Sequence, residues 1–250
     1  MQAFYKILFV FMLFSLIGYI IELFFRRFVS QKKWVNPGFL NGPYLPIYGF
    51  GASLMYVLIY YMSPLQEMIG NYWLYSIIVI LLIGIGMTII ELIAGLIFIK
   101  GMHIRLWDYS KRFGNFEGLI CPLFSVIWTV CGALFYFFIY KYVDIAVTYL
   151  ADKSYFILIL GIFYGVFVTD FGYSLHLATK IKEFAKNNEV VVHFEKLKLQ
   201  VHEYLKEKKE KSNFVLPLNN FNIVKERIAE SIKTNKEKFE NLKLKNKNKN

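Results

Sequence analysis

The chain has 250 residues, of which 56% are hydrophobic and 19% aromatic, and its formal net charge at neutral pH is +11. Its mean hydropathy of +0.42 excludes an ordinary soluble domain of this length. The excess of basic residues therefore indicates a face that lies against anionic lipid, and not a surface that binds nucleic acid.

Five apolar runs approach or exceed the roughly 20 residues that a membrane-spanning helix needs. In chain order these runs are 4–25, 44–62, 73–99, 118–140 and 155–178. The intervening loops 26–43 and 100–117 are basic, whereas 63–72 and 141–154 are not. Because basic loops stay in the cytoplasm, the N-terminus is expected outside. The sequence therefore predicts an all-α integral membrane protein of the cell membrane with five transmembrane helices, N-out and C-in.

A change in composition near residue 178 divides the chain into a transmembrane helical bundle, 1–178, and a basic cytoplasmic tail, 179–250. The tail carries 18 Lys and Arg against 10 Asp and Glu. An amphipathic helix is predicted over 190–208 from the spacing of Val190, Phe194, Leu197, Val201 and Tyr204. A second helix is predicted from Phe221, Val224, Ile228, Ile232 and Phe239. Residues 243–250 alternate Lys and Asn and are predicted to be disordered.

The bundle contains an internal repeat. Each copy has an apolar helix with one acid, a basic 18-residue loop with a tryptophan, and a second apolar helix entered through Gly-x-x-x-Pro. The copies cover about 4–62 and 73–140, and 155–178 resembles half a copy. Gly42 and Pro46 align with Gly118 and Pro122 at a constant offset. Both copies begin outside and end inside, so the repeat is parallel.

The three acids of the repeat, Glu22, Glu91 and Asp170, are expected inside the membrane. Glu22 lies about 6 Å of helix rise from Arg26, and the other two lie roughly 13–15 Å from their nearest basic residues. Glu22 can pair with Arg26 or snorkel, so a purely structural role is as plausible as a functional one. Glu91 and Asp170 must face the bundle interior, a water-filled cavity or a cation, or else form an ion pair that locks packing. The expected cations are Arg26, Arg27 and Arg105.

Both basic loops combine cationic, aromatic and amide groups, which are able to bind a headgroup, a nucleotide or a partner protein. The alternative is that Arg and Trp simply anchor the loops at the membrane surface. The candidate loop residues are Arg26, Arg27, Trp34, Asn41, Gly42, Pro43, Pro46, Tyr48, Arg105, Trp107, Asp108, Tyr109, Ser110, Asn115 and Gly118. No Cys/His group has zinc spacing and no catalytic set is recognisable, so we expect no metal, no cofactor and no catalytic residue.

Several of these blocks together resemble a known family. They are the acid-bearing helix, the run Arg105-Leu106-Trp107-Asp108-Tyr109-Ser110, the following Asn115 and Gly118, and the block from Asn41 to Gly49. These blocks resemble the bacterial ABC-transporter permeases of the CmpB type, also called ABC-transporter type IV. The resemblance covers about 1–178. It implies a permease, and it names neither a substrate nor a catalytic residue.

Transport is therefore the leading function, as a multi-pass permease subunit of unknown substrate. The 250 residues contain no Gly-x-x-x-x-Gly-Lys-Ser/Thr phosphate loop, so transport driven by ATP requires a separate ATPase subunit. Five helices are few for an enclosed pathway, which predicts a homo-oligomer or a hetero-complex. The alternatives are a cation-coupled carrier using Glu91 or Asp170, a membrane enzyme acting on lipid at the cytoplasmic face, and a sensor or assembly scaffold using the tail.

Overall fold

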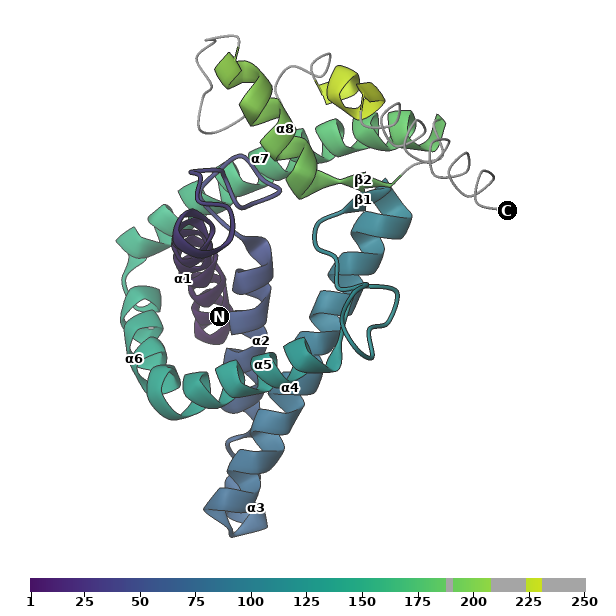
Figure 1. Cartoon of the computed structure of the whole chain (residues 1–250). Coiled ribbons are helices and arrows are strands. Elements are labelled where there is room, and N and C mark those ends of the chain that lie inside the picture. The colour runs from purple at the N-terminus through teal and green to yellow at the C-terminus, as the bar shows by residue number, and fades with distance from the viewer. Residues whose placement is uncertain (188–190, 208–223, 231–250) are drawn as a thin grey trace, which may run out of the picture. The chain divides into compact units, whose positions relative to one another are not determined.

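The structure is a computed structural model and describes residues 1–187, 191–207 and 224–230. Its elements (Figure 1) are α1 (Gln2–Phe25), η1 (Arg26–Ser30), α2 (Pro46–Met62), α3 (Leu65–Ile69), α4 (Tyr72–Leu96), η2 (Ile97–Gly101), β1 (Ile104–Arg105), α5 (Pro122–Leu134), η3 (Phe135–Ile139), α6 (Tyr140–Ala151), α7 (Ser154–Asn187), β2 (Val192–His193) and α8 (Phe194–Glu207). The η segments are π-helical. The predicted all-α class is confirmed, with one pair of two-residue strands in the described part of the chain.

Among the described residues, four helical segments are long and apolar enough to cross a membrane. They are Gln2–Ser30, Tyr72–Gly101, Pro122–Ala151 and Ser154–Asn187. The remaining predicted span, 44–62, corresponds to α2, which has 17 residues. A helix of that length rises about 25 Å, somewhat less than the roughly 30 Å of a bilayer's hydrocarbon core. Four of the five predicted spans are thus candidates by length and composition, and α2 is a shorter apolar helix.

The chain forms two compact units. The first comprises Met1–Ile97 and Trp107–Ser174, and the second comprises Phe98–Leu106 and Leu175–Asn250. In the first unit, α2 is central because its faces contact different helices. One core cluster joins it to α1, α6 and α7 through Phe9, Val10, Met12, Ala52, Tyr56, Val147, Ala151 and Leu160. The other joins it to α4 and η3 through Met55, Ile59, Tyr75, Val79, Ile83, Met87 and Phe135.

The helices α2 and α5 begin in the same way. Each has a proline in its first turn, Pro46 or Pro122, after a residue with an extended backbone. Proline suits this position because the N–H that it lacks would have no partner within the helix. α4 begins instead with a side-chain cap, in which Asn71 accepts a 3.1 Å hydrogen bond from the backbone N–H of Leu74.

The segment 141–154, predicted as a loop outside the membrane, is helical as far as Ala151. α5, η3 and α6 follow one another as one helical path, which turns between α5 and α6 in Figure 1. The turn falls at the π-helical η3, and π-helical insertions are a usual cause of helix kinks. The charges of this segment predicted a loop, but Val147 and Ala151 are buried in the core with α1. Its acid, Asp144, pairs with Lys6 of α1.

The second unit ties the loop after α4 to the beginning of the tail. β1 and β2 pair in parallel, with Ile104 opposite Val192 and Arg105 opposite His193. α8 follows β2 directly, and its Phe194 and Leu197 are buried, as an amphipathic helix in this region requires. Val190 of the predicted helix lies outside the described residues.

The rest of the tail is described only in part. Residues 224–230 are helical, and Val224 and Ile228 are buried. The predicted residues Phe221, Ile232 and Phe239 and the predicted disordered end 243–250 lie outside the described residues. α7 itself continues to Asn187, past the predicted end of the bundle at 178.

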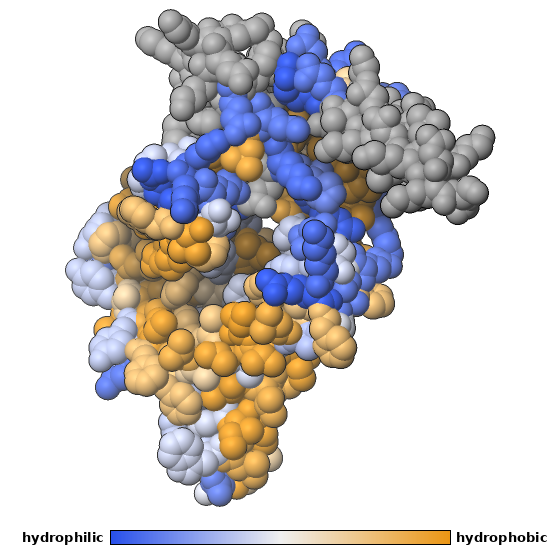
Figure 2. All heavy atoms as spheres, viewed as in Figure 1, coloured by the Kyte–Doolittle hydropathy of each residue, from blue (hydrophilic) through white to orange (hydrophobic). Residues whose placement is uncertain are grey.

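Large apolar side chains are exposed on the outer faces of the long helices. Ile85 on α4, Val130 on α5 and Ile162 on α7 are each more than half exposed. In Figure 2 such apolar residues cover much of the helical surface on the face shown. An apolar surface of this extent is unfavourable in water and is the expected outer face of a helical bundle in lipid.

Candidate functional site

Glu91 of α4 is the most buried of the three acids, with 4% of its surface exposed. Its Oε1 accepts a 2.9 Å hydrogen bond from the hydroxyl of Tyr109, which lies in the loop between β1 and α5. Its Oε2 accepts a 3.2 Å bond from the indole Nε1 of Trp128 on α5. Both oxygens are thus satisfied by neutral donors, and no cation among the described residues pairs with Glu91.

The loop that carries Tyr109 is folded by its own polar groups. The Tyr109 N–H donates to the Gly118 carbonyl at 2.9 Å, and the Trp107 indole donates to the Leu119 carbonyl at 2.8 Å. Asn115 donates to two loop carbonyls and accepts from the Gly118 N–H. Gly118 has φ +70°, which glycine adopts without strain. The Asn and Gly positions therefore serve to hold Tyr109 in place.

The Tyr109 ring stacks on Phe124 of α5, with centroids 4.3 Å apart and planes 9° apart. Burial raises the pKa of the Tyr109 hydroxyl above its ordinary value, and the neighbouring Glu91 raises it further. The hydroxyl therefore keeps its proton and remains a donor to Glu91 at any physiological pH.

Asp170 of α7 binds the other loop. Its Oδ1 accepts from the backbone N–H of Asn41 at 3.2 Å, and its Oδ2 accepts from the N–H of Gly42 at 2.8 Å and from the Tyr44 hydroxyl at 2.7 Å. A more distant contact, 3.5 Å, joins Oδ1 to the Ser174 hydroxyl one turn along α7. In the described part of the chain, Asp170 also has no cationic partner.

Gly42 and Asn36 explain why the first loop can present two adjacent N–H groups. A side chain at Gly42 would overlap the Tyr44 ring, so only glycine allows that ring to reach Asp170. Asn36 closes the loop by donating to the carbonyls of Leu40 and Asn41 at 3.1 and 3.2 Å. The Tyr44 hydroxyl thus joins the two backbone N–H groups as a third donor to Asp170.

Glu22 has a different environment. Its Oε1 accepts from Nε of Arg26 at 3.1 Å, the i,i+4 pair that the sequence predicts, and its Oε2 accepts from the Tyr48 hydroxyl at 3.3 Å. Arg27 turns to the loop instead, where it donates to the Lys32 carbonyl and lies 5.6 Å from the Trp34 ring centroid.

The structure thus brings some of the candidate loop residues to the three carboxylates. Arg26 and Tyr48 lie at Glu22, Asn41 and Gly42 at Asp170, and Tyr109 at Glu91. Among the other candidates, Pro46 begins α2 and Pro43 precedes Tyr44 in the first loop. The second loop is held by hydrogen bonds of Trp107, Asp108, Ser110, Asn115 and Gly118. Asp108 accepts from the Ser110 N–H at 3.0 Å. Arg105 lies in β1. The expected arginine partners of Glu91 and Asp170 are therefore replaced by tyrosine, indole and backbone donors.

Sequence reasoning missed two contributors. Trp128 is not among the candidates, although an indole N–H in the middle of an apolar helix needs an acceptor, and that signal points to a nearby acid. Asp144 was assigned to an external loop, but it lies on α6, where it accepts from Tyr56 at 2.6 Å and contacts Lys6 at 3.4 Å.

Long apolar helices, an apolar outer surface and carboxylates satisfied inside the bundle define a multi-pass α-helical membrane protein. Residues 9–175 match the family described as Putative ABC-transporter type IV, and the chain belongs to this family. The family resemblance drawn from the loop blocks is thereby confirmed. No curated protein and no solved structure matches the chain.

Proposed function

We propose that the chain is the membrane-spanning permease subunit of an ABC transporter and works with a separate ATP-binding subunit. The family match over 9–175 carries this proposal. The four long apolar helices agree with it. The printed sequence contains no phosphate-binding loop of the usual type, so the ATPase is expected on another chain.

The proposed topology places the N-terminus outside and the two basic loops and the tail in the cytoplasm of the cell membrane. The charge of the loops supports this orientation. In this arrangement α2 is the fifth span, slightly short for the bilayer, and the two helix–loop–helix copies are parallel. α2 and α5 both begin with a proline, Pro46 and Pro122, and this similarity supports the repeat.

The loops are the proposed contact surface for the ATPase. Each is hydrogen-bonded to an acid on a long helix, through Tyr109 to Glu91 and through Asn41 and Gly42 to Asp170. A displacement of either loop by a bound ATPase would therefore pull on α4 or α7. In this proposal the acids are anchors that couple the cytoplasmic loops to the membrane helices.

The test is affinity purification of the full chain from its native membrane, with ATP hydrolysis by the eluate as the readout. The proposal expects a stoichiometric ATP-binding subunit. It also expects that Glu91→Gln or Asp170→Asn abolishes transport while the chain is still expressed at the normal level. Phe4→Leu on the exposed end of α1 is the control, because Phe4 contacts neither loop anchor.

Purification of the chain without any ATP-binding subunit, from membranes in which it is active, would refute the ABC arrangement. Full activity in the combined Glu91→Gln and Asp170→Asn variant would refute the anchoring role and leave the ATPase partnership intact. A single-subunit monomer that transports would contradict the proposed homo-oligomer or hetero-complex.

A further inference from the structure

A second polar cluster lies at the far end of α1 and α2 from the first loop. It brings together Lys6 of α1, Tyr56 and Tyr60 of α2, and Asp144 of α6. The Lys6 ammonium is 3.4 Å from Asp144 Oδ1 and 5.8 Å from the centroid of the Tyr60 ring. The Tyr56 hydroxyl donates to the same Oδ1 at 2.6 Å. Lys6 is thus a cation held by a carboxylate and an aromatic face.

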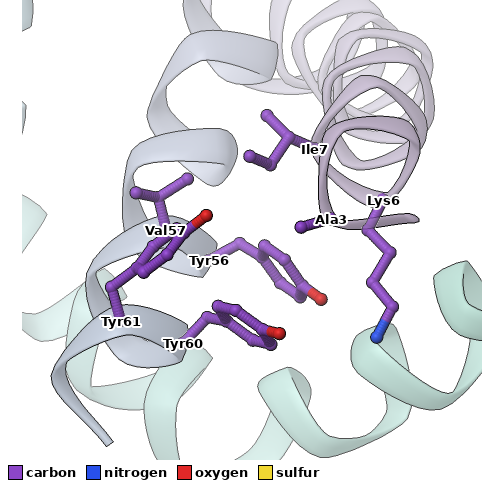
Figure 3. A pocket seen from close by; sticks show the side chains of 7 residues that line it. All are labelled: Ala3, Lys6, Ile7, Tyr56, Val57, Tyr60 and Tyr61. Carbon is purple, nitrogen blue, oxygen red and sulfur yellow. The ribbon is translucent and has the colours of Figure 1, made fainter. Parts of the chain in front are cut away.

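The cluster borders a shallow pocket between α1 and α2 that has no room for a ligand until a side chain moves. Figure 3 shows the hydroxyl ends of Tyr56 and Tyr60 pointing the same way, toward the side where the Lys6 ammonium lies. The two rings stack nearly parallel, with centroids 6.1 Å apart. Ala3, Ile7, Val57 and Tyr61 complete the pocket lining.

One acceptor in this cluster receives no hydrogen bond from the part of the chain that the structure describes. Lys6 and Tyr56 both bond to Oδ1 of Asp144, and no described residue donates to Oδ2. The Asp144 side chain is 36% exposed. A carboxylate oxygen beside aromatic rings is the combination that binds an organic ammonium ion, because the carboxylate supplies charge and the ring faces supply cation–π attraction.

We propose that this cluster is a binding site for a small organic ammonium ion, and that Lys6 is its resident cation. The ligand takes the place of the Lys6 ammonium between Asp144 and the Tyr60 ring. Lys6 can leave because it is only the fifth residue of α1, and a lysine near a helix end can extend its flexible stem toward the aqueous interface. Weakly hydrated alkylammonium ions are favoured over Na⁺ and K⁺, since the rings do not replace a tight hydration shell.

This site is separate from the loop anchors, and binding to it does not require an ATPase. The test therefore uses the purified full chain alone, in lipid nanodiscs, with radiolabelled choline as the probe. The unlabelled competitors are tetramethylammonium and 3,3-dimethyl-1-butanol, the uncharged carbon isostere of choline. We expect tetramethylammonium to compete and the isostere to fail at the same concentration.

Each substitution in the cluster is expected to change choline binding in a defined direction. Lys6→Met removes the competing cation and should tighten choline binding about tenfold, equivalent to roughly 1.4 kcal/mol. Asp144→Asn should abolish binding in both the wild-type and the Lys6→Met background. Tyr60→Phe keeps the ring and should bind normally, whereas Tyr60→Leu should bind at least several-fold more weakly.

The double variant Lys6→Met, Asp144→Asn replaces the ion pair by two neutral groups, so it shows whether loss of binding reflects loss of folding. Its elution from gel filtration should match that of the wild type. Equal competition by the uncharged isostere, or choline binding that survives Asp144→Asn, would overturn the proposal. Failure of a folded Lys6→Met variant to bind choline would overturn it as well.

Discussion

Glu22 and Glu91 hold equivalent places in the two copies of the predicted repeat, and they are satisfied in different ways. Glu22 uses a cation one turn along its own helix, Arg26, and a tyrosine of the next helix. Glu91 receives its two hydrogen bonds from Tyr109 in a loop and Trp128 on another helix. The first acid is thus partly satisfied locally, and the second depends wholly on tertiary structure.

The tyrosine hydroxyls that donate to Glu22 and Glu91 also come from different places in the fold. Tyr48, which donates to Glu22, corresponds by the constant offset of the repeat to Phe124, which has no hydroxyl. In the second copy the hydroxyl comes from Tyr109, whose ring stacks on Phe124. The same requirement, a donor for an acid in an apolar helix, is met once from a helix and once from a loop. Only the second solution links the acid to a loop.

The largest effect should come from Glu91→Ala. This change leaves the Tyr109 hydroxyl and the Trp128 indole without an acceptor, and each unsatisfied buried donor costs about 1–3 kcal/mol. We expect a large fall in the thermal unfolding midpoint of the purified protein in nanodiscs. Glu22→Ala is the matched variant and should lower the midpoint far less. Equal falls in the unfolding midpoint would contradict the distinction between an acid paired within its own helix and an acid that depends on tertiary hydrogen bonds.

The Glu91 site requires α4 and α5 to pack closely, and a substitution at Gly84 tests this packing. A methyl group at Gly84 would overlap Thr129, whereas one at Gly161 on α7 meets nothing within 4 Å. Gly84→Ala should therefore destabilise by about 1–3 kcal/mol through overpacking. Gly161→Ala is the control and should be neutral or mildly stabilising for the isolated chain. Measured unfolding midpoints that rank the two in the reverse order would contradict the packing of α4 on α5.

Asp170 holds the first loop through hydrogen bonds, as Glu91 holds the second. Asp170→Ala removes the acceptor of the Asn41 and Gly42 N–H groups, and hydrogen bonds to a charged group contribute about 1.5–3 kcal/mol. Hydrogen–deuterium exchange at these two amides should rise at least tenfold. Thr169→Val is the neighbouring control, because that hydroxyl bonds only to the Gly165 carbonyl of its own helix. Unchanged exchange in Asp170→Ala would show that the loop is held by other contacts.

The smallest effect is expected for Glu22→Gln. The Glu22–Arg26 pair is partly exposed, with 24% of the Glu22 side chain accessible, and exposed ion pairs contribute about 0–1 kcal/mol. The difference in unfolding midpoint from the wild type should be small and should shrink further at high salt, which screens the charges. A large difference in unfolding midpoint that does not depend on salt would show that Glu22 stabilises the fold in the same way as Glu91.

Hydropathy and charge were enough to predict an all-α membrane protein, four of its long helices and the acids within them. Those features repeat along the chain at helical spacing, so they can be recognised without tertiary information. The Glu22–Arg26 pair was predictable for the same reason. The loop blocks, with their fixed Asn, Gly and Pro positions, were enough to point to the family.

The partners of Glu91 and Asp170 were not predictable in this way. An arginine was expected because a charge suggests a countercharge, but the structure uses Tyr109, Trp128 and the backbone of Asn41 and Gly42. Which donor reaches which acid depends on how the loops fold back, and no local periodicity encodes that. α6 was not predicted because its charged residues favour a loop, and its apolar stripe becomes evident only from its burial against α1.

The pairing of β1 with β2 has a consequence for how the chain is made. Ile104 of β1 leaves the ribosome before α5, α6 and α7, and its partner Val192 leaves after all three. Because synthesis proceeds from the N-terminus at about 5–20 residues per second, β1 waits several seconds for its partner. This small sheet can therefore close only after α5, α6 and α7 have all been synthesised.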